Sequence, residues 1–267
     1  MTSTGPRDAR SEPAPQVLRW DPGLGRFRAE PAAELGELDV ADSWLLEDGA
    51  ARALPQHRDR FVAACAQRGV PDRGSTAFFD AACAALPGTG RWFPRVEYRA
   101  RAGFHVRLRP APPRSEAVIL GVADGPDPRR APRVKGPDLE RLVELRARAA
   151  TRVGADEVVL RSGDGLVLEG AVSSILWWRG DTLCAPPPEL PLLPGVTRAV
   201  LLNLAAQRGT PIRFEACTLP ELDGVEVWCV NALHGIRAVT GWIGAPCAAA
   251  PPRHAAAWRR ALAQYAG

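Results

Sequence analysis

The sequence predicts an α/β (α+β) fold in which two unequal domains follow a short tail. Strand-like apolar runs and helix-like spacings alternate along most of the 267 residues, and the composition, 46% hydrophobic and 24% charged, is that of an ordinary globular protein. A stretch rich in Gly, Asp, Pro and Arg, residues 123–132, offers little to pack and is the best candidate for a linker. We therefore expect domains at 17–122 and 133–267, after a mobile tail at 1–16.

The first domain is expected to mix strands and helices. Its apolar residues follow helical spacing in two stretches, the second of which is stopped by Pro87 and Gly88. Alternating polar and apolar residues around Gly103 are typical of a hairpin. In chain order, the expected elements are a strand at 43–46, helices at 54–68 and 75–86, a hairpin at 95–109 and a strand at 116–122.

The second domain is expected to begin with a helix at residue 139, where Asp138 is placed as the N-cap. An Asp-Gly turn at 162–165 separates two strand-like runs and is a strong signal for a hairpin. A proline-rich loop, residues 186–194, leads into a later helix. The expected elements are strands at 157–161, 166–169, 172–178, 212–215 and 225–230, and helices from 139, at 196–208 and at 253–265.

Charge and cysteine usage narrow the class of protein. The 34 basic and 30 acidic residues give a net charge of +4, and we interpret the densest basic clusters, 99–101 and 129–133, as solvated turns rather than a nucleic-acid surface. No segment has the pattern of a signal peptide or the ~20 apolar residues of a membrane helix. The six cysteines form no Cys-x-x-Cys pair and the four histidines show no metal-ligand spacing, so we expect a reduced, cytoplasmic protein without a metal or a membrane partner.

Three places in the second half carry a chemical signal. Lys135 is the only lysine among the 34 basic residues, Glu169 ends a predicted strand, and Gly195 and Thr197 open a predicted helix. An amine can bond an aldehyde carbon, a carboxylate can keep a pyridine nitrogen protonated, and a helix N-terminus binds phosphate. Together these groups meet the needs of pyridoxal phosphate. Taken singly, each has an ordinary explanation, as a solvated lysine, a strand-end carboxylate or a helix cap.

The local sequence around these residues resembles that of one known family. Lys135-Gly-Pro-Asp-Leu, Gly165-Leu-Val-Leu-Glu-Gly-Ala-Val-Ser-Ser and Leu193-Pro-Gly-Val-Thr-Arg are similar, in order and spacing, to the class IV aminotransferases. These fold-type IV pyridoxal-phosphate enzymes include branched-chain aminotransferases, D-amino acid aminotransferases and 4-amino-4-deoxychorismate lyases. The resemblance extends over most of residues 40 to 243, and Val230-Asn-Ala-Leu-His-Gly-Ile-Arg is most like the lyases.

The resemblance implies a fold and a set of roles. A smaller α/β N-terminal domain would meet a larger C-terminal domain built on a barrel-like sheet, with the cofactor in the cleft between them and a second copy of the chain completing a homodimer. Lys135 would form the Schiff base and move the proton at the substrate α-carbon, while Glu169 would pair with the ring nitrogen. The other cofactor-binding residues it implies are Arg60, for which a place on the helix surface is the alternative, and Gly195, Val196, Thr197, Asn231 and Ala232.

Three functions stay open at this point. The wording at Asn231 favours the lyase, which removes the α-proton of aminodeoxychorismate and eliminates pyruvate to leave 4-aminobenzoate. The alternative is an amino-acid transaminase of the branched-chain or D-amino acid type, which passes the amino group to a keto acid. Ser174 and Val230 depart from the Asn and the hydroxyl-bearing residue usual in the family, and the first half matches less well. The weaker match of the first half keeps open a cofactor-free binding protein on the same fold.

Overall fold

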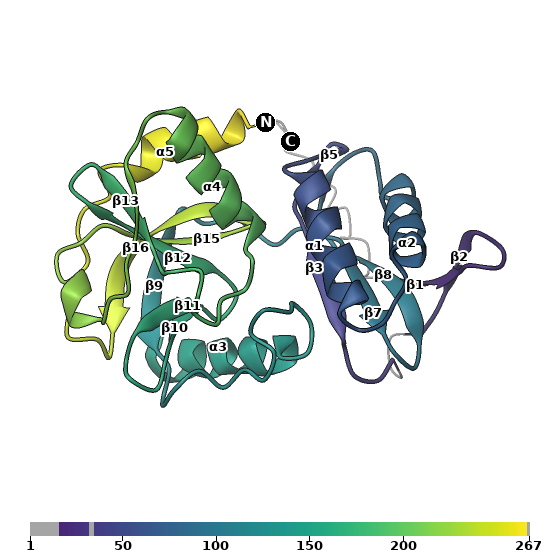
Figure 1. Ribbon diagram of the computed structural model, residues 1–267, viewed down its shortest axis with the longest axis horizontal. Helices are drawn as coiled ribbons and strands as arrows, with labels where there is room; N and C mark the ends of the chain where they lie inside the picture. The colour runs from purple at the N-terminus through teal and green to yellow at the C-terminus, as the bar shows by residue number, and fades with distance from the viewer. Residues whose placement is uncertain (1–15, 32–34, 266–267) are drawn as a thin grey trace, which may run out of the picture.

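Two main sheets organise the computed structural model, which describes residues 16–31 and 35–265. A five-stranded sheet, in the order β2-β1-β8-β7-β3, and a small three-stranded sheet, β5-β4-β6, are formed before residue 109. An eight-stranded sheet, in the order β11-β10-β9-β16-β15-β12-β13-β14, is formed after it. Figure 1 shows these parts as two lobes, each with its own helices, which agrees with the predicted α/β (α+β) class.

The smaller lobe packs two helices against its antiparallel sheet (Figure 1). Helices α1, Leu54–Ala66, and α2, Asp72–Ala84, confirm the two predicted helices. Their aromatic side chains, among them Phe61 and Phe78, join Val96 and Val106 of the sheet in a buried core. The strands are β1 Gln16–Asp21, β2 Arg26–Ala29, β3 Val40–Ser43, β4 Leu46–Glu47, β5 Ala50–Ala51, β6 Arg91–Trp92, β7 Arg95–Arg99 and β8 Gly103–Leu108.

Strand positions near the N-terminus differ in part from the prediction. The hairpin at 95–109 is confirmed as β7 and β8, but the strand expected at 43–46 lies earlier, because Val40–Ser43 pairs with β7 while Trp44 packs into the core. Gln16, assigned to the tail, begins β1, and residues 1–15 of that predicted tail lie outside the described residues. The hairpin of β1 and β2 is not predicted by the sequence.

The larger lobe carries a curled, mixed sheet with three α-helices, which agrees with the barrel-like domain that the resemblance implies (Figure 1). The sheet separates two cores, because successive side chains of a strand point to opposite faces. Leu176 and Trp178 of β12 pack with α4 and α5, whereas Ile175 and Trp177 pack with Val239 on the other face. None of the described helices is both long and apolar enough to cross a bilayer. The helices are α3 Leu139–Val153, α4 Val196–Gln207 and α5 Ala255–Ala263, and the strands are β9 Ala117–Val122, β10 Glu157–Arg161, β11 Val167–Gly170, β12 Ser174–Arg179, β13 Thr182–Ala185, β14 Ile212–Phe214, β15 Val227–Asn231 and β16 Gly235–Ile243.

The change from one sheet to the other lies at residues 109–116, before the predicted linker. The sequence predicts residues 117–122 to lie in the first domain, but they form β9, a central strand of the larger sheet that pairs in parallel with β10 and β16. The segment 123–132 that follows it is folded onto the larger lobe, where Asp127 N–H donates to Arg161 O at 2.7 Å. Glycine and proline punctuate ordered loops as well as linkers, so composition does not separate the two.

A buried carboxylate on the smaller sheet is hydrogen-bonded by several arginines. Glu97 of β7 is fully buried and accepts hydrogen bonds from Arg95, Arg99 and Arg107. Burial alone would raise the pKa of Glu97, but these guanidinium groups lower it below its ordinary value. The interpretation of 99–101 as a solvated turn is therefore wrong at Arg99, because the strand alternation places Arg95, Glu97 and Arg99 on one face.

Candidate active site

A cavity of about 400 Å³ is lined by residues of both lobes. The smaller lobe contributes Ser43 of β3 together with His57 and Arg60 of α1. The larger lobe contributes the segment before α3, the end of β11, the start of α4 and the turn between β15 and β16. All the residues nominated from the sequence line this cavity: Arg60, Lys135, Glu169, Gly195, Val196, Thr197, Asn231 and Ala232.

The start of α4 is uncovered toward the cavity. Gly195 is the N-cap of α4, and no side chain forms a capping hydrogen bond. The alternative explanation of Thr197 as a helix cap is therefore wrong. The first N–H groups of a helix have no partner within it, and the helix dipole adds partial positive charge there. A Cβ at Gly195 would lie 2.5 Å from Ser174 Oγ, so a larger residue here would require the Ser174 side chain to shift. This end of the cavity therefore suits a phosphate group.

Arg60 is fixed beside α4 by a buried carboxylate. Asp42 of β3 is fully buried and accepts hydrogen bonds from Arg60 Nε and Nη2, each at 2.7 Å, and it contacts His57 Nδ1 at 2.7 Å. Burial would raise the pKa of Asp42, but Arg60 and His57 lower it well below its ordinary value. Arg60 Nη1 donates to Pro194 O at 3.2 Å. With its side chain 13% exposed, Arg60 is a cavity residue and not a helix-surface arginine.

Lys135 is held at the seam between the lobes. Its carbonyl oxygen accepts a hydrogen bond from Ala41 N–H of β3 at 2.7 Å. Gly136 follows at φ 150°, and a Cβ there would lie 2.8 Å from Asp39 O, so only glycine permits this close approach. Burial, together with the positive charges of Arg60, Arg95 and Arg109, lowers the pKa of Lys135 to about 8. The amine therefore has a large neutral fraction near that pH.

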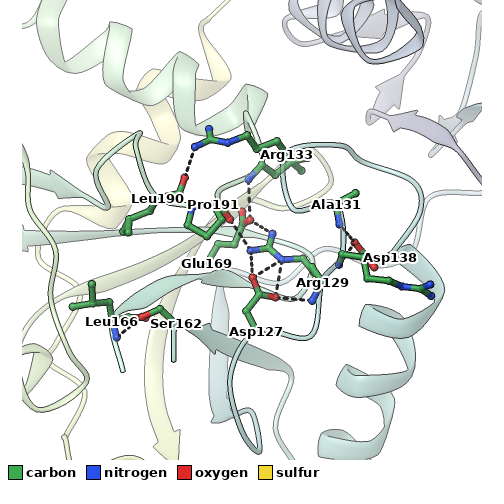
Figure 2. Close-up of polar contacts among 12 residues, drawn as sticks. Asp127, Arg129, Ala131, Arg133, Asp138, Ser162, Leu166, Glu169, Leu190 and Pro191 are labelled. Carbon is green, nitrogen blue, oxygen red and sulfur yellow. Dashed lines mark hydrogen bonds and ion pairs between the residues drawn. The ribbon is translucent and has the colours of Figure 1, made fainter. Parts of the chain in front are cut away.

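Glu169 places a nearly buried carboxylate in the same cavity, at the end of β11. Its Oε1 accepts hydrogen bonds from Arg129 Nη1 and from Leu193 N–H, the latter at 2.9 Å; Figure 2 shows the contact with Arg129. Burial raises the pKa of Glu169 above its ordinary value, and Arg129 and Leu193 oppose this shift without cancelling it. Arg129 is 4% exposed, so the interpretation of the 129–133 cluster as solvated is wrong at this residue.

Asn231 and Ala232 line the cavity at the turn between β15 and β16. Asn231 Nδ2 donates to Val172 O at 3.3 Å, and Asn231 Oδ1 accepts His234 N–H at 2.9 Å. The side-chain amide of Asn231 therefore braces the turn. Ser174, one of the two departures from the family wording, pairs with Val230, the other, across β12 and β15.

Asp138 is the N-cap residue of α3, as predicted, but its side chain does not cap the helix. No side chain caps α3; instead Asp138 Oδ2 accepts the N–H groups of Arg130, at 3.0 Å, and Ala131, at 2.8 Å. Figure 2 shows this carboxylate beside the segment that precedes Lys135. Asp138 thus keeps the N-cap position, while its carboxylate satisfies two backbone N–H groups of the folded loop instead of those of the helix.

Two cavity arginines of the smaller lobe are not signalled by the sequence. Arg95 and Arg109 lie close enough to Lys135 to lower its pKa, and burial beside Arg95 lowers the pKa of Arg109 to about 10. Arg109 Nε donates to Phe93 O at 3.2 Å, and its guanidinium lies 5.3 Å from the centre of the Phe93 ring. Among the described residues, no carboxylate forms an ion pair with Arg109. In a chain where all but one of 34 basic residues are arginine, spacing does not single out these two.

Comparison with known proteins identifies one family. The family model described as amino-transferase class IV matches residues 39–242. A bifunctional aminodeoxychorismate lyase / D-amino acid transaminase of Mycobacterium tuberculosis is 34% identical over 94 residues, which is 32% of this chain and 32% of that protein. A putative branched-chain-amino-acid aminotransferase of Methanocaldococcus jannaschii is 34% identical over 73 residues, 27% of this chain and 25% of that protein. The matched regions thus span only 32% and 25% of these curated relatives.

The fold extends the likeness to nearly the whole chain. The crystal structure of an aminotransferase from Brucella abortus bound to the cofactor PLP matches with a TM-score of 0.78 at 16% identity, and the match covers 94% of this chain and 99% of that one. Identity this low shows the shared fold and leaves the activity to be argued from the cavity.

Proposed function

The chain belongs to the class IV aminotransferase family, whose enzymes depend on pyridoxal phosphate, and we propose that it is a lyase that converts 4-amino-4-deoxychorismate to 4-aminobenzoate and pyruvate. One observation carries the proposal: the only lysine, Lys135, shares a cavity with the Glu169 carboxylate and the uncapped start of α4. An amine, a carboxylate and an anion-binding helix end are the groups that this cofactor requires.

The cavity residues fit the cofactor. No side chain caps the first N–H groups of α4, and Arg60 adds a guanidinium beside them, so this end would hold the phosphate. Glu169 would hold the ring nitrogen, because a buried carboxylate stabilises positive charge next to it. Lys135, with its lowered pKa, would bond the aldehyde carbon.

The chain's own residues then divide the chemical work. When bound, the cofactor supplies a conjugated ring that takes up the electron pair left when the substrate α-carbon loses its proton. Lys135 Nζ takes that proton, since an amine with a pKa of about 8 is an effective base near neutral pH. Arg109 and Arg95 hold a substrate carboxylate, because a guanidinium fork matches two carboxylate oxygens and Arg109 has no described carboxylate partner of its own.

The lyase reaction balances without a further reactant. The proton removed from the substrate is matched by one delivered to the departing enolpyruvate carbon, while the ether C–O bond breaks. The products, 4-aminobenzoate and pyruvate, account for every atom of the substrate. A base that both accepts and returns a proton is therefore sufficient, and Lys135 can serve in both steps.

Both candidate activities, lyase and transaminase, would use this site. The Asn231-Ala-Leu wording and the name of the Mycobacterium tuberculosis relative support the lyase, and the same relative and the Methanocaldococcus protein support the transaminase as the second candidate. Membership of an enzyme family, with Lys135 and Glu169 brought together in one cavity, argues against the cofactor-free binding protein.

A substrate assay separates the candidates. Freshly generated aminodeoxychorismate is incubated with the cofactor-loaded protein, and pyruvate release is followed through lactate dehydrogenase, with Lys135→Ala as the control. We expect pyruvate from the wild-type protein and none from the variant. Transfer of the amino group from L-leucine or D-glutamate to a keto acid, without pyruvate from aminodeoxychorismate, would make the protein a transaminase instead.

We also propose that the chain works as a homodimer in the cytoplasm. The resemblance to the family supports the dimer. All six cysteines are free thiols, as is usual in a reducing compartment, which supports the cytoplasm. Light scattering of the purified protein is expected to give the mass of two chains, and the mass of one chain would contradict the dimer.

A further inference from the structure

The segment that leads from β9 to α3 makes more contacts than a linker needs. At its centre, Arg129 is 4% exposed and donates from Nε and Nη2 to both oxygens of Asp127, at 2.7 to 3.0 Å. Its Nη1 donates to Glu169 Oε1, and its Nη2 donates to Pro191 O at 3.0 Å (Figure 2). One guanidinium thus joins a carboxylate that orients it, a carboxylate of the active site and the loop that leads into α4.

This contact decides which oxygen of Glu169 faces a ligand. Oε1 is occupied by Arg129 Nη1 and Leu193 N–H, whereas Oε2 receives no hydrogen bond from the described residues. Because Glu169 lines the cavity, Oε2 is the oxygen left for a donor inside it. The rotation of the carboxylate is fixed before any ligand arrives.

Arg129 also supplies the positive charge that stabilises the ionised Glu169 carboxylate most. Glu169 is nearly buried, and a buried carboxylate favours the protonated form unless a cation lies beside it. Among the described residues, Arg129 forms the only ion pair with Glu169. Arg198 of α4 acts on it from a greater distance and Asp127 acts with the opposite sign, while Leu193 contributes only its N–H group.

We propose that Arg129, oriented by Asp127, is a positioning residue that fixes Glu169 through Oε1 and favours the ionised form of its carboxylate, so that Oε2 accepts the proton-bearing ring nitrogen of the cofactor. The inference rests on the proposed function for its catalytic meaning. The pairing of Arg129 with Glu169 is a property of the protein alone, so it can be tested without cofactor or substrate.

The first test titrates Glu169 in the cofactor-free protein. Infrared difference spectra between pH steps report the carbonyl band of a protonated carboxylic acid, and the band is assigned to Glu169 by its absence in Glu169→Gln. In Arg129→Gln we expect the midpoint of this band to rise by about 1–3 pH units, the usual effect of one adjacent opposite charge. Arg129→Lys, which keeps the charge, is expected to rise less. A midpoint in Arg129→Gln equal to that of the wild type would overturn the proposal.

Arg133 provides a matched control. Its guanidinium donates to the carbonyl oxygens of Pro188, Glu189 and Leu190, so it holds the same proline-rich loop without touching Glu169. Arg133→Gln should leave the Glu169 midpoint unchanged. If it shifts the midpoint as much as Arg129→Gln does, the loop and not the ion pair governs Glu169, and the proposal fails.

A second measurement uses the wild-type protein and does not depend on the folding of a variant. In a crystal structure with bound pyridoxal phosphate, we expect the ring nitrogen within about 2.6–3.2 Å of Glu169 Oε2, with Arg129 still on Oε1. A ring nitrogen on Oε1, or an Arg129 displaced from Glu169, would overturn the proposal. Failure of the protein to bind the cofactor at all would instead count against the proposed function, and the infrared titration would still decide the role of Arg129.

Discussion

Gly195→Ala tests the close packing of the start of α4 against Ser174. Gly195 has φ −68° and ψ 118°, values that alanine adopts readily, so backbone strain does not enter. The added Cβ would lie 2.5 Å from Ser174 Oγ, whereas the contacts to Arg198 Cβ at 3.5 Å and Ser174 Cβ at 3.7 Å are ordinary. Overpacking of this kind costs roughly 1–3 kcal/mol. If that cost falls on the phosphate site, the dissociation constant for pyridoxal phosphate rises about 5- to 160-fold.

The assay is an equilibrium titration of the cofactor-free protein with pyridoxal phosphate, followed by absorbance, with thermal denaturation as a check on folding. The matched control is the double variant Ser174→Ala with Gly195→Ala, which removes the clashing oxygen and should recover most of the lost affinity. Wild-type affinity in Gly195→Ala would refute the reasoning, and so would a double variant as weak as the single one.

Other outcomes test the remaining site residues. Covalent attachment of pyridoxal phosphate to the cofactor-free protein should speed up as pH rises through about 8, because only the neutral Lys135 amine attacks; a midpoint near the ordinary lysine value of 10.5 would contradict the lowered pKa. Arg60→Ala should weaken cofactor binding and lower the free energy of unfolding by roughly 3 kcal/mol, because the buried Asp42 carboxylate loses its guanidinium partner. An unchanged free energy of unfolding in chemical denaturation would contradict a stabilising role for this ion pair. Arg109→Leu should raise the substrate KM about tenfold or more while cofactor affinity stays the same, and a KM within error of wild type would remove Arg109 from the carboxylate site.

The parts of this molecule that follow local rules are predictable from the sequence. The turn at 162–165 and the helix opened by Gly195 lie where the prediction places them, because Asp-Gly and Pro-Gly impose their conformations on a few neighbouring residues. Lys135 stands out because an amine is irreplaceable for the chemistry and the chain contains one lysine. Such signals need no knowledge of the tertiary fold.

What the sequence leaves hidden depends on contacts between distant segments. Arg129 and Glu169 are 40 residues apart, and neither lies in a pattern that pairs them. The sequence places Asp138 correctly at the N-cap of α3, but it does not show that its carboxylate binds two N–H groups of the preceding loop. β9 reads as the end of the first domain until β10 and β16 come to lie on either side of it. In each case the deciding partner is supplied by the fold, so local propensity has no access to it.

Lys135, as the residue that bonds the cofactor, is the central assignment in this cavity. Protein saturated with pyridoxal phosphate is reduced with borohydride, digested with trypsin and analysed by mass spectrometry, with Lys135→Ala in parallel. Because the chain has one lysine, we expect a single peptide, residues 134–141, to carry the mass of the reduced cofactor in the wild type and no peptide to carry it in the variant. Absence of the adduct from the wild-type peptide, or an equal amount of adduct in the variant, would contradict the assignment of this cavity.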